Sequence, residues 1–141
     1  MAEMEQSSSV HDDRLQALHR RQPDPDALSA AGKELQIAWP ADYIAFMQST
    51  DGADGWIGKS YVDLWSAADL IDRNRRYQVE EFAPTLVIFG SDGAGEAFAF
   101  NRSTDPPTIV IVPFVGLDEP ISQGPSFADL IARLHAGRLF E

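Results

Sequence analysis

The sequence predicts an α+β fold in which a mainly antiparallel β-sheet packs against N-terminal helices, one mid-chain helix and a C-terminal helix. Helical periodicity dominates the first part of the chain, strand-like segments follow it, and an amphipathic helix closes it. The link between the apolar runs 85–89 and 97–100 is short. Because parallel neighbours need a long crossover, this link favours antiparallel pairing.

The helices are recognised by their caps and by their apolar spacing. Asp24 is a suitable N-cap, and Pro25 fits the first helical position after it. In the last helix, which we expect between Ser126 and Gly137, apolar residues recur at the i, i+3, i+4 and i+7 positions of one face. The other predicted helices are Asp13–Arg21, Asp24–Leu35, Ala41–Thr50 and Ala67–Tyr77.

Four strands are predicted from alternation or from short apolar runs between turn residues. A glycine-rich turn, Gly90–Glu96, joins the second strand to the third, and Thr50–Gly58 is expected to be a turn because it contains two Asp-Gly pairs. The predicted strands are Ser60–Trp65, Thr85–Phe89, Ala97–Phe100 and Thr108–Val112.

The composition is that of one globular domain. The chain has 141 residues, of which 44% are hydrophobic. Residues 1–12 are polar and predict a disordered tail, so residues 13–141 are expected to form the domain. No apolar run approaches the roughly 20 residues of a membrane helix. The N-terminus also lacks the features of a signal peptide, so we expect a cytoplasmic location.

The charge balance restricts the class of partner. Twenty-two acidic residues outnumber eleven basic ones, which gives a formal net charge of −11. Nucleic acids and anionic membranes are disfavoured as ligands, because binding to them needs clustered Lys and Arg. A basic protein partner would be attracted instead. The absence of cysteine excludes disulfides and thiol catalysis.

The turn Gly90–Glu96 could be a phosphate cradle, a metal loop or a hairpin. A phosphate loop needs a lysine and a following helix, whereas here no lysine is present and a strand follows. Asp92 and Glu96 are too few ligands for calcium, and nothing suggests an apolar pocket that would make them an acid–base pair. The hairpin is therefore favoured, and we expect no catalytic residue, metal or cofactor.

The loop around Trp56 allows two interpretations. Tryptophan is enriched at the energetic centres of protein interfaces, and Trp56 lies close to Asp51 and Asp54. The other interpretation is that Trp56 folds back onto the core, as we expect for Trp39 and Trp65.

Two motifs together resemble the Smi/Knr-type branch of the SUKH superfamily. WPADYIAFMQSTDG at Trp39–Gly52 is similar to its entry segment, and IFGSDGAGEAFAFN at Ile88–Asn101 is similar to its glycine-rich hairpin. TIVIVPF at Thr108–Phe114 and the final helix fit its closing elements. The likeness spans about Asp24–Leu134. It departs from the family pattern in four places: Trp39, Thr50-Asp51-Gly52, Ala94 and Asn101.

The resemblance implies an α+β fold and a non-enzymatic role. Bacterial members of the superfamily are often immunity proteins that bind a cognate toxin, frequently a nuclease. On this basis we expect a protein-binding domain with a basic partner, and the alternative is a stand-alone regulatory or scaffold domain. The residues expected to make the contacts are Asp51, Asp54, Trp56, Asp92 and Glu96. The sequence does not indicate the oligomeric state.

Overall fold

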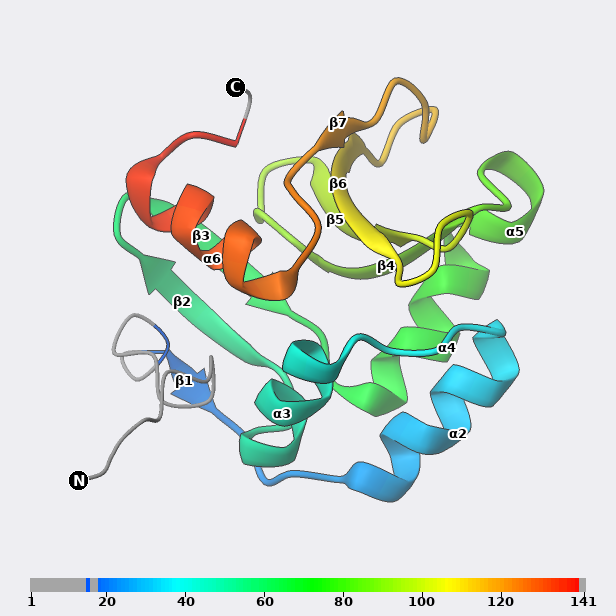
Figure 1. The fold of residues 1–141 in the computed structure, drawn as a ribbon, viewed down its shortest axis with the longest axis horizontal. Coiled ribbons are helices and arrows are strands. Elements are labelled where there is room, and N and C mark those ends of the chain that lie inside the picture. Colours follow the sequence, from blue (N-terminus) through cyan, green and yellow to red (C-terminus); the bar gives the residue numbers. More distant parts are fainter. Residues whose placement is uncertain (1–14, 16–17, 140–141) are drawn as a thin grey trace.

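The computed structural model describes Leu15 and residues 18–139. Its centre is one antiparallel sheet of seven strands, in which every strand pairs with the next one along the chain. The strands are β1 (His19–Arg20), β2 (Ala53–Ile57), β3 (Ser60–Leu64), β4 (Leu86–Ser91), β5 (Glu96–Asn101), β6 (Thr108–Pro113) and β7 (Ile121–Ser122). The helices are α2 (Pro25–Leu35), α3 (Ala41–Ser49), α4 (Ala67–Arg76), α5 (Val79–Phe82) and α6 (Phe127–Ala136). The described part of the chain is thus α+β, as predicted (Figure 1).

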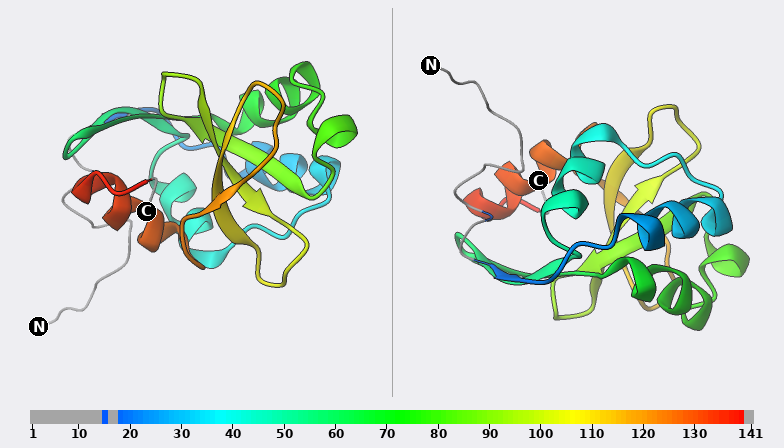
Figure 2. Two further views of the ribbon diagram at one scale, coloured as in Figure 1. Left: turned by 90° about the horizontal axis from the view of Figure 1, so that it is seen from above. Right: turned by 90° about the horizontal axis from the view of Figure 1, so that it is seen from below.

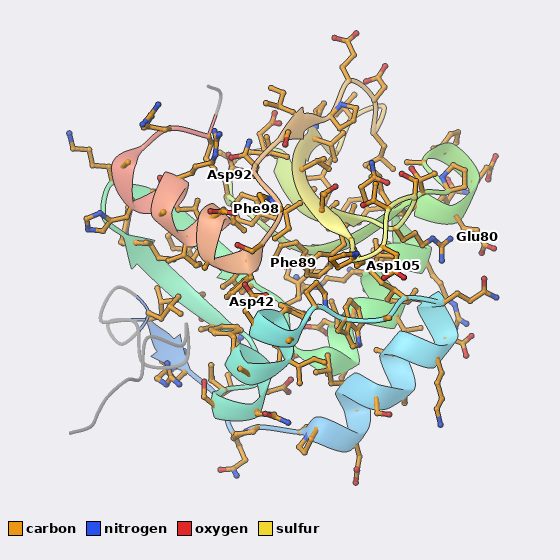
Figure 3. The ribbon with its side chains drawn as sticks, in the orientation of Figure 1. Asp42, Glu80, Phe89, Asp92, Phe98 and Asp105 are labelled. Carbon is orange, nitrogen blue, oxygen red and sulfur yellow. The ribbon has the colours of Figure 1, made fainter. Side chains whose placement is uncertain are left out.

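The helices cover both faces of the sheet. In the two views of Figure 2, α3 and α6 lie on one side of it, and α4 and α5 lie on the other, with α2 alongside α4. An aromatic core lies under α3 and α6. Phe89 stacks on Phe100 with ring centroids 4.3 Å apart, and Tyr43 of α3 and Phe127 of α6 pack against these rings. Figure 3 shows Phe89 and Phe98 at the centre of the molecule.

The predicted caps are present. The side chains of Asp24 and Ser126 accept hydrogen bonds from the amides of Ala27 and Asp129, and so satisfy N–H groups that the helix leaves free. Gly137 ends α6 with a φ of 70°, a conformation that glycine adopts without strain.

Two local predictions were wrong. In the predicted helix Asp13–Arg21, Leu15 is helical, but His19–Arg20 form β1; residues 13, 14, 16 and 17 lie outside the described part. Leu15 and Leu18 are both buried. The predicted turn Thr50–Gly58 contains strand β2. His19–Arg20 form a strand because they pair with β2, and all of β2 pairs with β3, so in both cases strand pairing overrides local propensity.

The junction between β3 and β4 depends on a side chain. β3 pairs with β4 only at Asp63 and Leu64, after which a bulge at Phe89 interrupts the register between β4 and β5. Beyond this point the Asn74 side chain of α4 donates a hydrogen bond to the carbonyl of Ile88 and accepts one from its amide. The helix thereby replaces the missing stretch of β3.

Candidate protein-binding surface

Among the described residues, one face of the sheet carries partly exposed side chains over β2 and β3. Strand alternation places Ala53 and Ile57 in the core and turns Asp54 and Trp56 to the opposite side. Cross-strand partners share a face, so Tyr61 lies beside Trp56, and Asp63 lies beside Asp54. We call these four residues the open face.

Two aromatic rings are presented on the open face. Trp56 is 63% exposed, and its ring packs edge-on against Tyr61 with centroids 5.7 Å apart. The second interpretation of Trp56, that it folds onto the core, is therefore wrong, whereas Trp65 is buried as predicted. Tyr61 was missed as a candidate, although its place in an alternating strand was the signal that could have identified it.

The β4–β5 turn lies against the same aromatic pair. At Gly93 a Cβ atom would come within 2.9 Å of the Tyr61 ring, so only glycine allows this close approach. The structure therefore brings together strand β2, through Trp56, and the β4–β5 turn, through Gly93, with Tyr61 between them.

Charged groups border the aromatic pair. Asp54 accepts a hydrogen bond of 3.1 Å from Arg21 and lies 3.4 Å from the His19 ring nitrogen Nδ1. Asp63 lies 3.8 Å from Arg73. Burial raises the pKa of Asp63, and Arg73 and Arg21 only partly oppose that shift. The border of the open face is therefore a mixed network of charges.

Two of the remaining predicted contact residues, Asp51 and Asp92, have structural partners. Asp51 accepts a hydrogen bond of 2.8 Å from the amide of Ala67, at the start of α4. Asp92 accepts bonds from the amides of Ala94 and Glu96, which closes the hairpin turn. Burial, and then the nearby charge of Asp92, raise the pKa of Glu96. The structure thus groups Asp54 with Trp56 and places Asp51 apart from them.

Alternation separates Glu96 from the open face. Ala97 pairs with Ser91, which in turn pairs with Asp63, so Ala97 lies on the open side of the sheet. Its neighbour Glu96 is directed to the opposite side. A single partner surface could include the turn around Asp92, but the Glu96 side chain would stand on its far side.

Two searches of the described residues gave negative findings. Within the described ranges, no group of three or more His, Asp or Glu side chains is arranged to hold a metal ion. No helix in the same part of the chain has the length and apolar character needed to cross a membrane.

A comparison with profiles of protein families gives a match. The sequence profile of the SMI1 / KNR4 family (SUKH-1) matches residues 22–133, which is most of the chain. No curated protein gave a significant sequence match. The profile covers both segments in which the family resemblance was found, Trp39–Gly52 and Ile88–Asn101.

Proposed function

This chain belongs to the SMI1 / KNR4 family (SUKH-1), and from that premise we propose that it is a non-enzymatic protein-binding domain. The family is consistent with an immunity or a regulatory role. The more specific proposal is an immunity protein that binds and neutralises a cognate toxin. Its mechanism is occlusion, in which the bound domain covers the surface that the toxin needs for its activity.

The observation that carries the proposal is the exposed Trp56–Tyr61 pair. A large aromatic side chain that is 63% exposed leaves apolar area in water, and its burial by a partner would be favourable. Tryptophan and tyrosine are enriched among the residues that dominate binding energy. The charged border, with Asp54 and Asp63, suits the polar rim that surrounds such a centre.

The net charge of −11 supports a basic partner. Opposite charges accelerate encounter and disfavour wrong partners, and they contribute less to final affinity. A nuclease toxin is a partner of this type, because its own substrate-binding surface must attract phosphates.

The test is co-expression with toxins whose genes lie beside the gene for this chain. We expect the wild-type chain to protect cells and to co-purify with one such toxin. Trp56→Ser should weaken that complex by about 30-fold or more, as loss of a hot-spot residue does. Val115→Ser is the matched control, because Val115 is 88% exposed but lies in the loop after β6. Full toxicity for every linked candidate would refute the immunity role.

The alternative is a stand-alone regulatory or scaffold domain, which family membership supports equally. It predicts no linked toxin gene and a host protein as the partner. Trp56→Ser should weaken capture of that protein to a similar extent, because the same open face would be used.

A further inference from the structure

The glycine-rich turn between β4 and β5 packs against one member of the aromatic pair on the open face. The sheet order places β3 between β2 and β4, so Tyr61 of β3 has Trp56 on one side and this turn on the other. The centroids of the Trp56 and Tyr61 rings are 5.7 Å apart. On the other side, a Cβ atom added at Gly93 would lie 2.9 Å from the Tyr61 ring. The tyrosine ring is therefore held between an indole ring and the backbone of the turn.

Hydrogen bonds within the turn fix its shape. Oδ1 of Asp92, a residue labelled in Figure 3, accepts bonds of 2.8 and 3.0 Å from the amides of Ala94 and Glu96. The Asp92 amide in turn donates to the Glu96 carbonyl. The Ser91 hydroxyl accepts a further bond of 3.2 Å from the Gly93 amide. Because side-chain oxygens of this kind replace backbone partners in tight turns, the turn is a fixed surface for the ring that packs on it.

Two glycines of the turn differ in what surrounds them. Gly93 has a φ of 76° and Gly95 a φ of 108°, so the backbone favours glycine at both positions. A Cβ at Gly95 would meet nothing within 4 Å, whereas one at Gly93 would meet Cδ2 and Cε2 of Tyr61. Gly93 therefore has a requirement that Gly95 lacks, which is the close approach of the tyrosine ring.

A fixed aromatic pair binds a partner at a lower entropic cost. The Trp56 side chain is 63% exposed, and without support it would sample several rotamers. A partner would then have to order that side chain on binding, which weakens a complex. A ring that is already held in its bound orientation avoids this loss, as rigid aromatic anchors do in matured binding sites.

We propose that the β4–β5 turn is a positioning element, which holds Tyr61 against Trp56 so that the pair meets the protein partner in one orientation. Gly93 acts by allowing the close approach, and Asp92 acts by fixing the turn. Asp92 is thus a positioning residue, whose effect on binding depends on its acceptor oxygen and not on its charge. This inference rests on the proposed function, since it concerns how the same face binds its partner.

The proposal is tested first on the free whole chain, by NMR relaxation of the tryptophan indole N–H groups. We expect an order parameter of about 0.8 for the Trp56 indole in the wild type, and a value below about 0.6 in Gly93→Ala. Trp65, which is 3% exposed, is the internal reference and should stay rigid in both proteins. A mobile Trp56 indole in the wild type, or an equally ordered one in Gly93→Ala, would overturn the proposal.

Two further variants assign the effect to the contact between the turn and the ring. Gly95→Ala is the matched control, because it adds the same methyl group in the same turn at positive φ but does not touch Tyr61. It should leave Trp56 ordered, and equal loosening would assign the effect to strain in the turn instead. Tyr61→Ser removes the ring and leaves the turn sequence intact, so it should release Trp56 as Gly93→Ala does. An ordered Trp56 in that variant would contradict the role given to Tyr61.

A pair of substitutions at Asp92 separates positioning from direct contact. Asparagine keeps an oxygen that can accept the bonds from Ala94 and Glu96, whereas alanine does not. Asp92→Ala should therefore release the Trp56 indole, and Asp92→Asn should not. In a complex with the linked toxin, Asp92→Ala should weaken binding about 3- to 10-fold and Asp92→Asn less than about 2-fold. Equal weakening by both variants would show that Asp92 acts through its charge.

The positioning role and the immunity role fail separately. If Gly93→Ala releases the Trp56 indole but the chain protects against no linked toxin, the positioning role stands and the immunity role is refuted. If a toxin complex forms and Gly93→Ala leaves its affinity unchanged, the proposed function stands and the positioning role is refuted.

Discussion

Replacement of Asn74 by leucine should destabilise the fold more than any surface change. Asn74 is 5% exposed and lies between α4 and β4. Its Oδ1 accepts a bond of 2.9 Å from the amide of Ile88, and its Nδ2 donates bonds of 2.8 Å to the carbonyls of Ile88 and Leu70. Leucine has a similar size, so it removes these bonds with little change in packing volume.

The expected loss of stability can be calculated from the backbone groups that lose their hydrogen-bond partner in Asn74→Leu. The carbonyl of Leu70 retains its helical hydrogen bond. Both polar groups of Ile88 become buried without a partner, because β3 has already separated from β4 at that point. Each such group costs roughly 1–3 kcal/mol. The expected loss is therefore about 2–6 kcal/mol, a large part of the 5–15 kcal/mol that is typical of a domain.

Urea unfolding followed by far-UV circular dichroism measures this loss. The midpoint should fall with little change in slope. Asp72→Asn is the control on the same helix, because Asp72 is 64% exposed and forms only an i,i+4 pair with Arg76. That control should change stability by no more than about 0.5 kcal/mol. A loss below about 1 kcal/mol for Asn74→Leu would refute the view that α4 replaces β3 here.

Three further predictions concern single sites. In the same unfolding assay, Gly58→Ala should lower the free energy of unfolding by about 1–3 kcal/mol more than Gly137→Ala does. Both glycines have positive φ, but of the two only Gly58 lies so close to another backbone atom that an added Cβ would clash. That atom is the His135 carbonyl oxygen, which would be 2.4 Å from the Cβ. The raised pKa of Asp63 means that its contribution to stability is greatest in acid and is lost as the pH rises through the folded-state pKa. Asp63→Asn should therefore raise the melting temperature at pH 7, and this increase should disappear below about pH 4. An increase of the same size at every pH would show that the charge of Asp63 is not its cause. Trp56→Ser should change the free energy of unfolding by no more than about 0.5 kcal/mol, because the side chain is mostly exposed; a larger loss would mean that Trp56 supports the fold.

The helices were predictable because their signals are local. The apolar face of α6, from Phe127 to Leu134, is fully buried, and its caps Ser126 and Gly137 are where the sequence placed them. The strands β4, β5 and β6 were also predicted within one or two residues at each end, since each is a short apolar run between turn residues.

The candidate site was only partly predictable. Trp56 and Asp54 were identified from residue type and turn context, and the structure places both on the open face. Tyr61 was missed, because its place beside Trp56 follows from the pairing of β2 with β3.

By itself the sequence determined the α+β class, the family, and the helices whose caps and periodicity lie within a few neighbouring residues. Only the tertiary structure decided that His19–Arg20 and Ala53–Ile57 are strands and that Asn74 completes a sheet. The physical reason is that a β-ladder forms its hydrogen bonds between segments far apart in the chain. A strand of two to five residues is stabilised by the strand with which it pairs, so local propensity does not determine whether it forms.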